Sequence, residues 1–410
     1  METKFTKSIT EPFKTLGNKT FGKLYFAQAA SLFGDAFTWL GLALLTYQIS
    51  PEKSAIILAS ALTLRVTAYI VFSPFAGVVS DKFPRKKILL ITQFFRMVIV
   101  SLLPFVTQEW QIYGLIFFLN IFSAFFMPTY RAIIPQVVEK EQYREANGLS
   151  MATFQMLSVF GPGLAGLTTV WLGAQQIFFV NGITLLIAIL LIISIPFSEL
   201  QKGVNAENAA NDKAWRNVLK GVKLLFGNKI IRFALSIEFI SAIAGAMILV
   251  NTVGLVKTSL ALDDKHYGWV MAAFGVGGAI TAFLLGSLDK SKTRSISLIS
   301  GAMMIGITIS VANFVPFEGL MLLWVLAGIG QTLADMPSET LIGENIEPQD
   351  QGKVYGSHFA FSHLWWAIAY PIAGFVGTKF RGTDFLYGGL LTITIVILAI
   401  VLLKPFKNQD

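Results

Sequence analysis

The chain has 410 residues, of which 54% are hydrophobic and 14% are charged, and it contains no cysteine. About 25% of the residues of an ordinary soluble domain are charged, so this composition excludes a soluble enzyme, a disordered chain and a disulfide-stapled secreted domain. The net charge of +8 would favour nucleic-acid binding only if the basic residues were clustered for it. Their distribution indicates a membrane protein instead.

Twelve apolar stretches follow one another along the chain, each long enough to cross a bilayer core about 30 Å thick. We expect helices at 23–49, 54–79, 87–106, 110–134, 147–172, 176–196, 229–254, 267–288, 296–314, 317–343, 353–378 and 384–403. Runs such as 185–195 are continuously apolar, which excludes the alternating pattern of transmembrane strands. The predicted fold class is therefore an all-α membrane protein with twelve transmembrane helices.

Most of the 32 lysine and arginine residues lie in the N-terminal tail, the polar middle and the loops on one side of these stretches. Positive residues favour the cytoplasmic side, so we expect both termini in the cytoplasm and the chain in a bacterial cytoplasmic membrane. Residues 1–22 show no cleavable signal, and the first span should act as its own insertion signal. Because the basic segments serve topology, no nucleic-acid partner is expected.

A long polar stretch at 197–228 divides the spans into two sets of six. Within it, residues 215–226 place apolar side chains at helical spacing beside basic ones, which predicts an amphipathic helix on the anionic cytoplasmic leaflet. Landmark residues of the two sets match at an offset near 209: Gly77 with Gly286, Arg85 with Arg294, Pro128 with Pro337, and Pro162 with Pro371. We therefore predict a six-helix bundle at 1–196, a linker at 197–228 and a pseudo-symmetric bundle at 229–410, as in transporters.

The loop between the second and third spans combines a glycine, an acid and several bases. It reads Gly77-Val-Val-Ser-Asp81-Lys-Phe-Pro-Arg85-Lys86-Lys87. An aspartate near a helix end can pair with a nearby cation and latch two rigid units; the alternative is that these charges only enforce topology. The second half carries a weaker copy. The expected gating residues are Gly77, Asp81, Arg85, Lys86, Asp289 and Arg294.

This loop resembles the signature of the major facilitator superfamily, G-x-x-x-D-[RK]-x-x-[RK]-[RK]. The fifth span contains Gly161, Pro162, Gly163 and Gly166, and resembles the helix-kink motif of antiporters in that superfamily; the alternative is an ordinary kink. The segments 127–138 and 145–148, with Gly34-Asp35, resemble the macrolide-efflux and enterobactin-exporter branch. The resemblance implies a proton-driven exporter that works as a monomer, is not an enzyme and needs no cofactor.

Carboxylates within apolar spans are costly and are functional hypotheses by default. Asp35 lies in the first span, Glu238 in the seventh, and Asp335 and Glu339 in the tenth. The last two are four residues apart and share one helix face, where mutual repulsion favours proton uptake. We predict proton coupling for these four residues.

Two arginines are expected as charge partners of these carboxylates. Arg65, at a similar depth in the second span, is expected to reach Asp35, for which the alternative role is a permanent ion pair. Arg131, in the fourth span, corresponds to Glu339, which otherwise meets water. His358 lies in the eleventh span and suits either a proton relay or a buried neutral contact.

Aromatic and amide side chains at mid-depth are candidates for a substrate cavity, by stacking, cation–π contact and hydrogen bonding. The predicted lining residues are Trp39, Tyr69, Asn120, Gln331, His363 and Trp366; for the aromatic ones the alternative is packing or lipid contact. We predict no metal site. The sequence and the resemblance together favour proton antiport that exports amphipathic, drug-like, macrolide-like or siderophore-like molecules by alternating access. The alternatives are a lipid or lipid-linked head-group flippase and a solute importer or uniporter.

Overall fold

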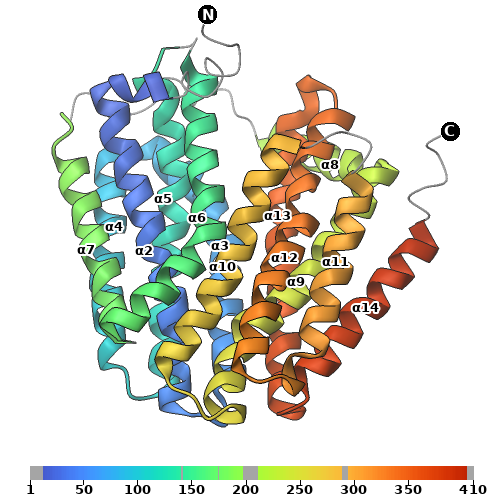
Figure 1. Ribbon diagram of the computed structural model, residues 1–410. Helices are drawn as coiled ribbons and strands as arrows, with labels where there is room; N and C mark the ends of the chain where they lie inside the picture. The colour runs from blue at the N-terminus through green and yellow to red at the C-terminus, as the bar shows by residue number, and fades with distance from the viewer. Residues whose placement is uncertain (1–12, 140–141, 174, 197–210, 289–293, 404–410) are drawn as a thin grey trace, which may run out of the picture. The chain divides into compact units, whose positions relative to one another are not determined.

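The computed structural model describes residues 13–139, 142–173, 175–196, 211–288 and 294–403. Nearly all of these residues are helical, and the described ranges contain no β-strand. The helices labelled in Figure 1 are α2 (Lys19–Ile49), α3 (Ser54–Lys82), α4 (Arg85–Leu102), α5 (Glu109–Val137), α6 (Tyr143–Leu172), α7 (Gln176–Ile193), α8 (Asn211–Gly227), α9 (Lys229–Gly254), α10 (Asp264–Leu288), α11 (Arg294–Ser310), α12 (Phe317–Asn345), α13 (Pro348–Lys379) and α14 (Asp384–Leu403). Helices suit apolar runs in lipid because they satisfy every backbone N–H and C=O group within one segment.

The predicted spans and the observed helices agree closely. The predicted spans 229–254 and 384–403 coincide with α9 and α14, and most other ends lie near those predicted. Ten helices in the described ranges are long and apolar enough to cross a membrane. The all-α membrane fold is therefore confirmed. α6 and α10 are not among the ten, so the count of twelve spans stays a prediction.

Several helix ends follow from local sequence. Asn228 separates α8 from α9, and its Oδ1 accepts hydrogen bonds from the backbone N–H groups of Ile230 (2.9 Å) and Ile231 (3.2 Å), as an N-cap residue does. α9 ends in a π-helical turn at Leu255–Ser259, and Ala261 beyond it has φ 56°. A residue other than glycine rarely adopts this left-handed conformation, so the connection from α9 to α10 is strained.

The chain forms two compact units, which are described separately. Unit 1 consists of Met1–Gly41, Thr67–Gly161 and Ala174–Ala206. Within it, α4 packs against both α5 and α7. Its buried core includes Phe21, Leu89, Phe126, Tyr130, Ala146 and Ile192. α2 and α7 approach closely at Gly34, where a Cβ atom would overlap the side chains of Asn181 and Thr184. A glycine is required at this position because the polar side chains of α7 fill the space beside it.

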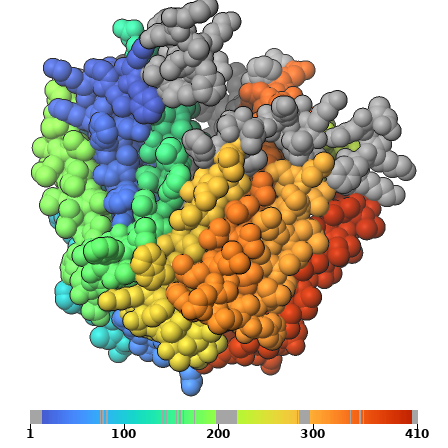
Figure 2. All heavy atoms as spheres, in the orientation of Figure 1, coloured from blue at the N-terminus to red at the C-terminus, as the bar shows by residue number. Residues whose placement is uncertain are grey.

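Unit 2 consists of Leu42–Val66, Pro162–Gly173 and Glu207–Asp410. In this unit α12 packs against α9, α10 and α11, and α9 also packs against α13 and α14. Figure 2 shows the atoms of α10, α11 and α12 in direct contact. Gly277, Gly301 and Gly328 stand at these crossings, each against the backbone of the neighbouring helix. Small residues allow such close approach between helices in lipid.

The predicted linker helix is present as α8, and its last turns pack against α13. Gly221 stands at the crossing, where a Cβ atom would lie 2.5 Å from Ser357 Oγ and would overlap the backbone oxygen of Lys353. Leu225 is fully buried, in a cluster that includes Val354 of α13. Leu225 of the predicted apolar face thus packs on the protein, Leu219 is 51% exposed, and contact of α8 with a membrane surface stays a prediction.

Charged residues reinforce this contact between α8 and α13. Asp350 accepts hydrogen bonds from Lys220 Nζ (2.7 Å) and Lys353 Nζ (2.6 Å). The bond from Lys220, ahead of the bond from Lys353, holds the pKa of Asp350 below its ordinary value. The same carboxylate raises the pKa of Lys220. Both groups therefore stay charged over a wide pH range while α8 is docked.

The boundaries of the compact units differ from those of the predicted bundles at 1–196 and 229–410. Leu42–Val66 and Pro162–Gly173 belong to the first half of the sequence but pack within unit 2. The predicted bundles describe a sequence repeat, which a clustering of contacts does not test, so that division stays a prediction.

Candidate functional site

Unit 2 contains a buried group of polar side chains from α9, α12 and α13. Glu238 of α9 and His358 of α13 are 9% and 7% exposed. The Nε2 atom of His358 lies 2.7 Å from Glu238 Oε1. The other carboxylate oxygen, Oε2, is buried and has no hydrogen-bond partner among the described residues. One oxygen of this carboxylate is therefore held by an imidazole and the other lacks a donor.

Asp335 belongs to the same group. Gln331, one turn earlier on α12, donates from Nε2 to Asp335 Oδ2 (2.6 Å) and to Ser241 Oγ of α9 (2.6 Å). Asp335 also interacts electrostatically with Glu238 and His358. Two predicted proton-coupling residues, Glu238 and Asp335, are thus brought together. We call the group of Glu238, Ser241, Gln331, Asp335 and His358 the acidic cluster.

Close packing around Gln331 fixes its place beside Asp335. Gly245 of α9 makes room for it, since a Cβ atom there would lie 2.7 Å from Gln331 Oε1 and 2.8 Å from the ring of Trp366. The Trp366 ring packs on Tyr370 with centroids 5.3 Å apart. Of the predicted cavity residues, Gln331 therefore belongs to the acidic cluster and Trp366 borders it.

The acidic cluster holds two carboxylates and one imidazole in a poorly hydrated setting. Burying a charge without a partner is costly, and coupled carboxylates avoid that cost by taking up protons. The arrangement is therefore suited to binding and releasing a proton. Sequence reasoning named Glu238, Asp335 and Gln331 individually, but it missed Ser241 and the contact between Glu238 and His358, which depend on helix packing.

Unit 1 contains a second buried polar group, centred on Asp35 and Arg96. Arg96 Nη2 donates to both carboxylate oxygens of Asp35 at 2.7 Å, and Nη1 donates to Ser31 Oγ (2.8 Å) and Gln93 Oε1 (2.7 Å). The side chains of Arg96 and Asp35 are 2% and 24% exposed. Asn181 of α7 adds a longer bond of 3.4 Å to Asp35.

Arg96 of α4, which the sequence analysis did not name, is a partner of Asp35 within unit 1. A contact between Arg65 and Asp35 stays a prediction. Arg65 belongs to unit 2, where it interacts electrostatically with His363 and Tyr370 of α13. Arg96 carried a signal that sequence reasoning missed, because a charge within an apolar span has a function by default.

The described residues of the gating loop bind backbone oxygens within unit 1. Arg85 Nη1 donates to the oxygen of Ala132 (2.7 Å), at the end of α5. Lys86 Nζ donates to the oxygens of Ile193 (2.9 Å) and Ile195, at the end of α7. Basic side chains satisfy the last carbonyl groups of helices in this way. These contacts fasten three helices together at one end.

Several predicted gating residues cannot be placed in this way. Asp289 lies outside the described residues, and the side chains of Asp81 and Arg294 and the surroundings of Gly77 also lie outside the described part of the structure. A latch in this loop therefore stays a prediction.

The glycines of the predicted helix-kink motif pack closely. A Cβ atom on Gly163 would lie 3.2 Å from the Cα atom of Gly275, and one on Gly166 would lie 2.9 Å from the backbone nitrogen of Ala272, both on α10. On Gly161 it would lie 2.8 Å from the Cβ atom of Ala36. Close packing of this motif is thus observed. The surroundings of Pro162 lie outside the described part of the structure, and a role of the motif in transport stays a prediction.

The remaining predicted residues belong to both units, and each is described within its own unit. Asn120 donates from Nδ2 to the oxygen of Ile116 of its own helix (2.7 Å). His363 contacts the oxygen of Phe359 through Nδ1 (2.8 Å). Arg131 approaches the sulfur of Met151 (3.4 Å), and the side chain of Glu339 lies outside the described residues. Trp39 and Tyr69 are partly buried, and the substrate cavity stays a prediction.

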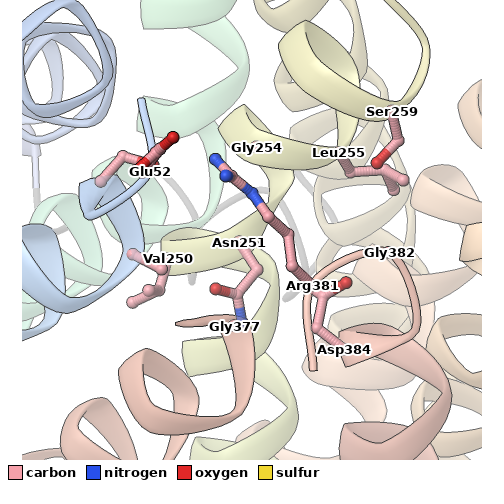
Figure 3. Close-up of a pocket in the computed structure, with 12 residues that line it drawn as sticks. Glu52, Val250, Asn251, Gly254, Leu255, Ser259, Gly377, Arg381, Gly382 and Asp384 are labelled. Carbon is pink, nitrogen blue, oxygen red and sulfur yellow. The ribbon is translucent and has the colours of Figure 1, made fainter. Parts of the chain in front are cut away.

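A small polar pocket lies among the ends of α9 and α13, the start of α14 and the turn between α2 and α3 (Figure 3). Its volume is about 20 Å³, which is room for one water molecule. Asn251 lines it, and its buried Oδ1 has no hydrogen-bond partner in the described part of the chain. Arg381 donates to the backbone oxygen of Pro51 beside it. The pocket is too small for an organic substrate.

Comparison with known sequences identifies the family. The sequence profile of the Major Facilitator Superfamily matches residues 24–255 and 234–409, which together span most of the chain. The chain belongs to the major facilitator superfamily. Membership of this superfamily and the ten membrane-spanning candidates make it a multi-pass membrane transport protein. The resemblance found in its loop motif is thus confirmed.

Curated relatives of this superfamily member cover nearly its full length. Macrolide efflux protein A of Streptococcus pyogenes is 24% identical over 403 residues, which cover 95% of this chain and 96% of the relative. The uncharacterised transporter YjbB of Bacillus subtilis is 25% identical over 404 residues, with the same coverages of 95% and 96%. The predicted resemblance to the macrolide-efflux branch is confirmed at this low identity.

Solved structures of transporters share the fold of this superfamily member. The nucleoside transporter NupG matches with a TM-score of 0.70 at 13% identity, covering 95% of this chain and 100% of its own. A POT family transporter in complex with 5-aminolevulinic acid matches with a TM-score of 0.69 at 10% identity, covering 94% and 96%. At such identities the likeness shows the fold alone.

Proposed function

We propose that this transporter exports amphipathic small molecules from the bacterial cytoplasm in exchange for protons. The observation that carries the proposal is the acidic cluster, in which Glu238 and Asp335 share one buried site with His358. A structural group of this kind would be expected to have its charges matched. Here two carboxylates face one imidazole, so the net charge of the acidic cluster depends on how many protons it binds.

Proton binding at this cluster would drive alternating access through the helices that carry it. Glu238, Asp335 and His358 lie on three different helices, so any movement of α13 against α9 or α12 changes their separation. A conformation that separates the carboxylates from the imidazole binds a proton with a different affinity from one that joins them. The membrane potential then supplies about 2.3 kcal/mol per charge per 100 mV.

The role of Asp35 in this proposal is secondary. Its charge is already matched by two bonds from Arg96, so we assign it a permanent ion pair and assign proton exchange to the acidic cluster. This choice separates two roles that the sequence left open for Asp35.

Export and the substrate class are supported by one relative and by the packing of two groups of side chains. The relative from Streptococcus pyogenes is named a macrolide efflux protein, and Gly163 and Gly166 of the helix-kink motif pack closely on α10. Aromatic rings also pair on α9 and α13: Trp366, which borders the acidic cluster, packs on Tyr370, and Phe239 packs on Trp365 with centroids 5.0 Å apart. Such rings suit the apolar part of an amphipathic molecule.

The proposal is tested in everted vesicles that contain the overproduced protein. An inside-acid pH gradient is established and followed with a fluorescent amine, and an amphipathic cation, a macrolide or a siderophore is added. We expect at least one compound to dissipate the gradient and to accumulate in the vesicles. If none of the three classes of compound causes proton movement, antiport is contradicted. Movement of the compound out of the everted vesicles identifies an importer.

Matched variants make the vesicle assay specific. Glu238→Gln and Asp335→Asn should abolish coupled proton movement, whereas Glu318→Gln, which changes an exposed residue at the start of α12, should leave it unchanged. Scrambling of fluorescent lipids by the purified protein in liposomes would identify a flippase instead. Coupled transport that persists in both acidic-cluster variants would overturn the proposed site.

A further inference from the structure

His358 is the residue of the acidic cluster for which the sequence left two roles open, a proton relay and a buried neutral contact. It lies on α13, and it faces Glu238 of α9 at 2.7 Å. Asp335 of α12 interacts electrostatically with both Glu238 and His358, His363 of α13 interacts with His358, and Arg65 of α3 acts on His363. His358 is therefore in electrostatic contact with both carboxylates of the cluster.

The bonding of Glu238 indicates what is missing from this contact. Oε1 meets the imidazole, while Oε2 is buried and without a donor in the described structure. A carboxylate beside a neutral imidazole would be charged, buried and under-bonded, which is an expensive state. One proton relieves it, either on the carboxyl group or on the imidazole.

The atoms directed at the two carboxylates also distinguish a proton from a metal cation. Glu238 meets an imidazole nitrogen, and Asp335 meets the Nε2 donor of Gln331 (2.6 Å). A hard cation such as Mg²⁺ or Ca²⁺ requires several oxygen ligands, whereas an N–H donor and an imidazole compete with it for the same carboxylate oxygens. The bonding of the cluster therefore favours protons.

From these contacts we infer that Glu238 and His358 hold one proton between them, and that His358 is the positioning residue that makes the coupling ion a proton. The proton moves between the carboxyl oxygen and Nε2, so that one O–H bond breaks as one N–H bond forms. Separation of α13 from α9 ends this sharing and releases the proton to Asp335 or to water. This inference rests on the proposed function, which it deepens by naming the pair of residues that holds the proton and the residue that selects it over other ions.

The chain offers a direct spectroscopic test, because it contains only three histidines. Protein labelled with ¹⁵N-histidine gives three imidazole signal sets, which His266→Gln and His363→Gln assign by elimination without altering His358. We expect His358 to lose its proton at a midpoint about one pH unit or more away from that of an ordinary imidazole. Glu238→Gln should move that midpoint by a similar amount and leave the His266 signal unchanged.

The control histidine is well matched, since His266 also contacts a carboxylate, Asp263 at 2.6 Å, but does so at 39% side-chain exposure. If the His358 signal titrates as an ordinary imidazole and does not change in the Glu238→Gln variant, the shared proton does not exist. This measurement needs no transport and uses the wild-type protein as its main sample.

Transport measurements provide the second test. His358→Gln keeps a polar side chain but cannot exchange a proton. The change in export rate between two pH values should therefore be at least about tenfold smaller in His358→Gln than in His266→Gln. Replacing a proton gradient by a sodium gradient at constant pH should drive no export by the wild type. Sodium-driven export, or an unchanged pH profile in a folded His358→Gln variant, would overturn this inference alone. Absence of any proton movement in the wild type would instead overturn the proposed function.

Discussion

Replacing Asp35 with asparagine removes the charge that balances Arg96 but nearly preserves the shape of the side chain. Arg96 donates to both carboxylate oxygens at 2.7 Å and is 2% exposed, so Asp35→Asn leaves a buried guanidinium without a counter-charge. Loss of one partner from a buried pair costs about 3–5 kcal/mol. We expect about 3 kcal/mol, because Ser31 and Gln93 still accept from Nη1 and Asp35 is 24% exposed.

The free energy of unfolding can be measured in mixed detergent micelles, by titrating in a denaturing detergent and following helicity by circular dichroism. Glu318→Gln is the control, because it removes an exposed carboxylate and should change stability by less than about 0.5 kcal/mol. The double variant Asp35→Asn with Arg96→Gln should lose less than the sum of the two single losses, by at least about 1 kcal/mol.

Two results would refute this reasoning. If Asp35→Asn is as stable as the wild type, the ion pair contributes nothing and the buried guanidinium finds other partners. If the two single losses add without coupling, then Asp35 and Arg96 act independently despite their contact. In either case Asp35 would again be a candidate proton carrier.

The remaining predictions concern the contact between α8 and α13. Gly221→Ala should loosen it by about 1–3 kcal/mol, the usual cost of overpacking, whereas Gly227→Ala, whose Cβ meets open space, should not. In this cysteine-free chain, a cysteine introduced by Leu225→Cys is labelled by a maleimide only when α8 separates from α13. Gly221→Ala should speed this labelling at least tenfold. Equal labelling rates with Gly221→Ala and with Gly227→Ala would contradict the packing of α8 on α13. The lowered pKa of Asp350, which follows chiefly from the bond donated by Lys220, means that its contribution is complete above the ordinary value near pH 4 and is lost as the pH falls through the lowered value. The melting temperature of the wild type should therefore fall more than that of Asp350→Asn on acidification from about pH 6 to about pH 3, and parallel curves would contradict this role for Asp350.

The helices themselves could be predicted from the sequence because the bilayer makes hydrophobic length sufficient. The predicted span 229–254 coincides with α9, since a polar capping residue, Asn228, precedes an unbroken apolar run. The linker helix was also predictable from its spacing of apolar and basic residues. Its docking was not, because nothing in an amphipathic pattern tells a membrane surface from the flank of α13.

The polar contacts were harder to predict, since they depend on which helices are neighbours in space. Asp35 was recognised as a costly charge, but its contact with Arg96 on α4 was not predicted, because depth in the membrane does not determine which helices are neighbours. The joining of Glu238, Asp335 and His358 required the packing of α9 against both α12 and α13. Most of the charged and polar residues of the two buried groups could thus be predicted from the sequence, but their contacts with one another could not.

The close crossings of α10, α11 and α12 limit which substitutions this protein tolerates. At Gly277, Gly301 and Gly328 the adjacent backbone occupies the volume of a side chain, so every other amino acid forces helices apart. Val276 and Ile280 on α10 are 48% and 49% exposed, and at such outward positions many apolar residues fit equally well. A saturation library should therefore retain diverse alleles at these two outward positions and only the parental codons at the three glycines.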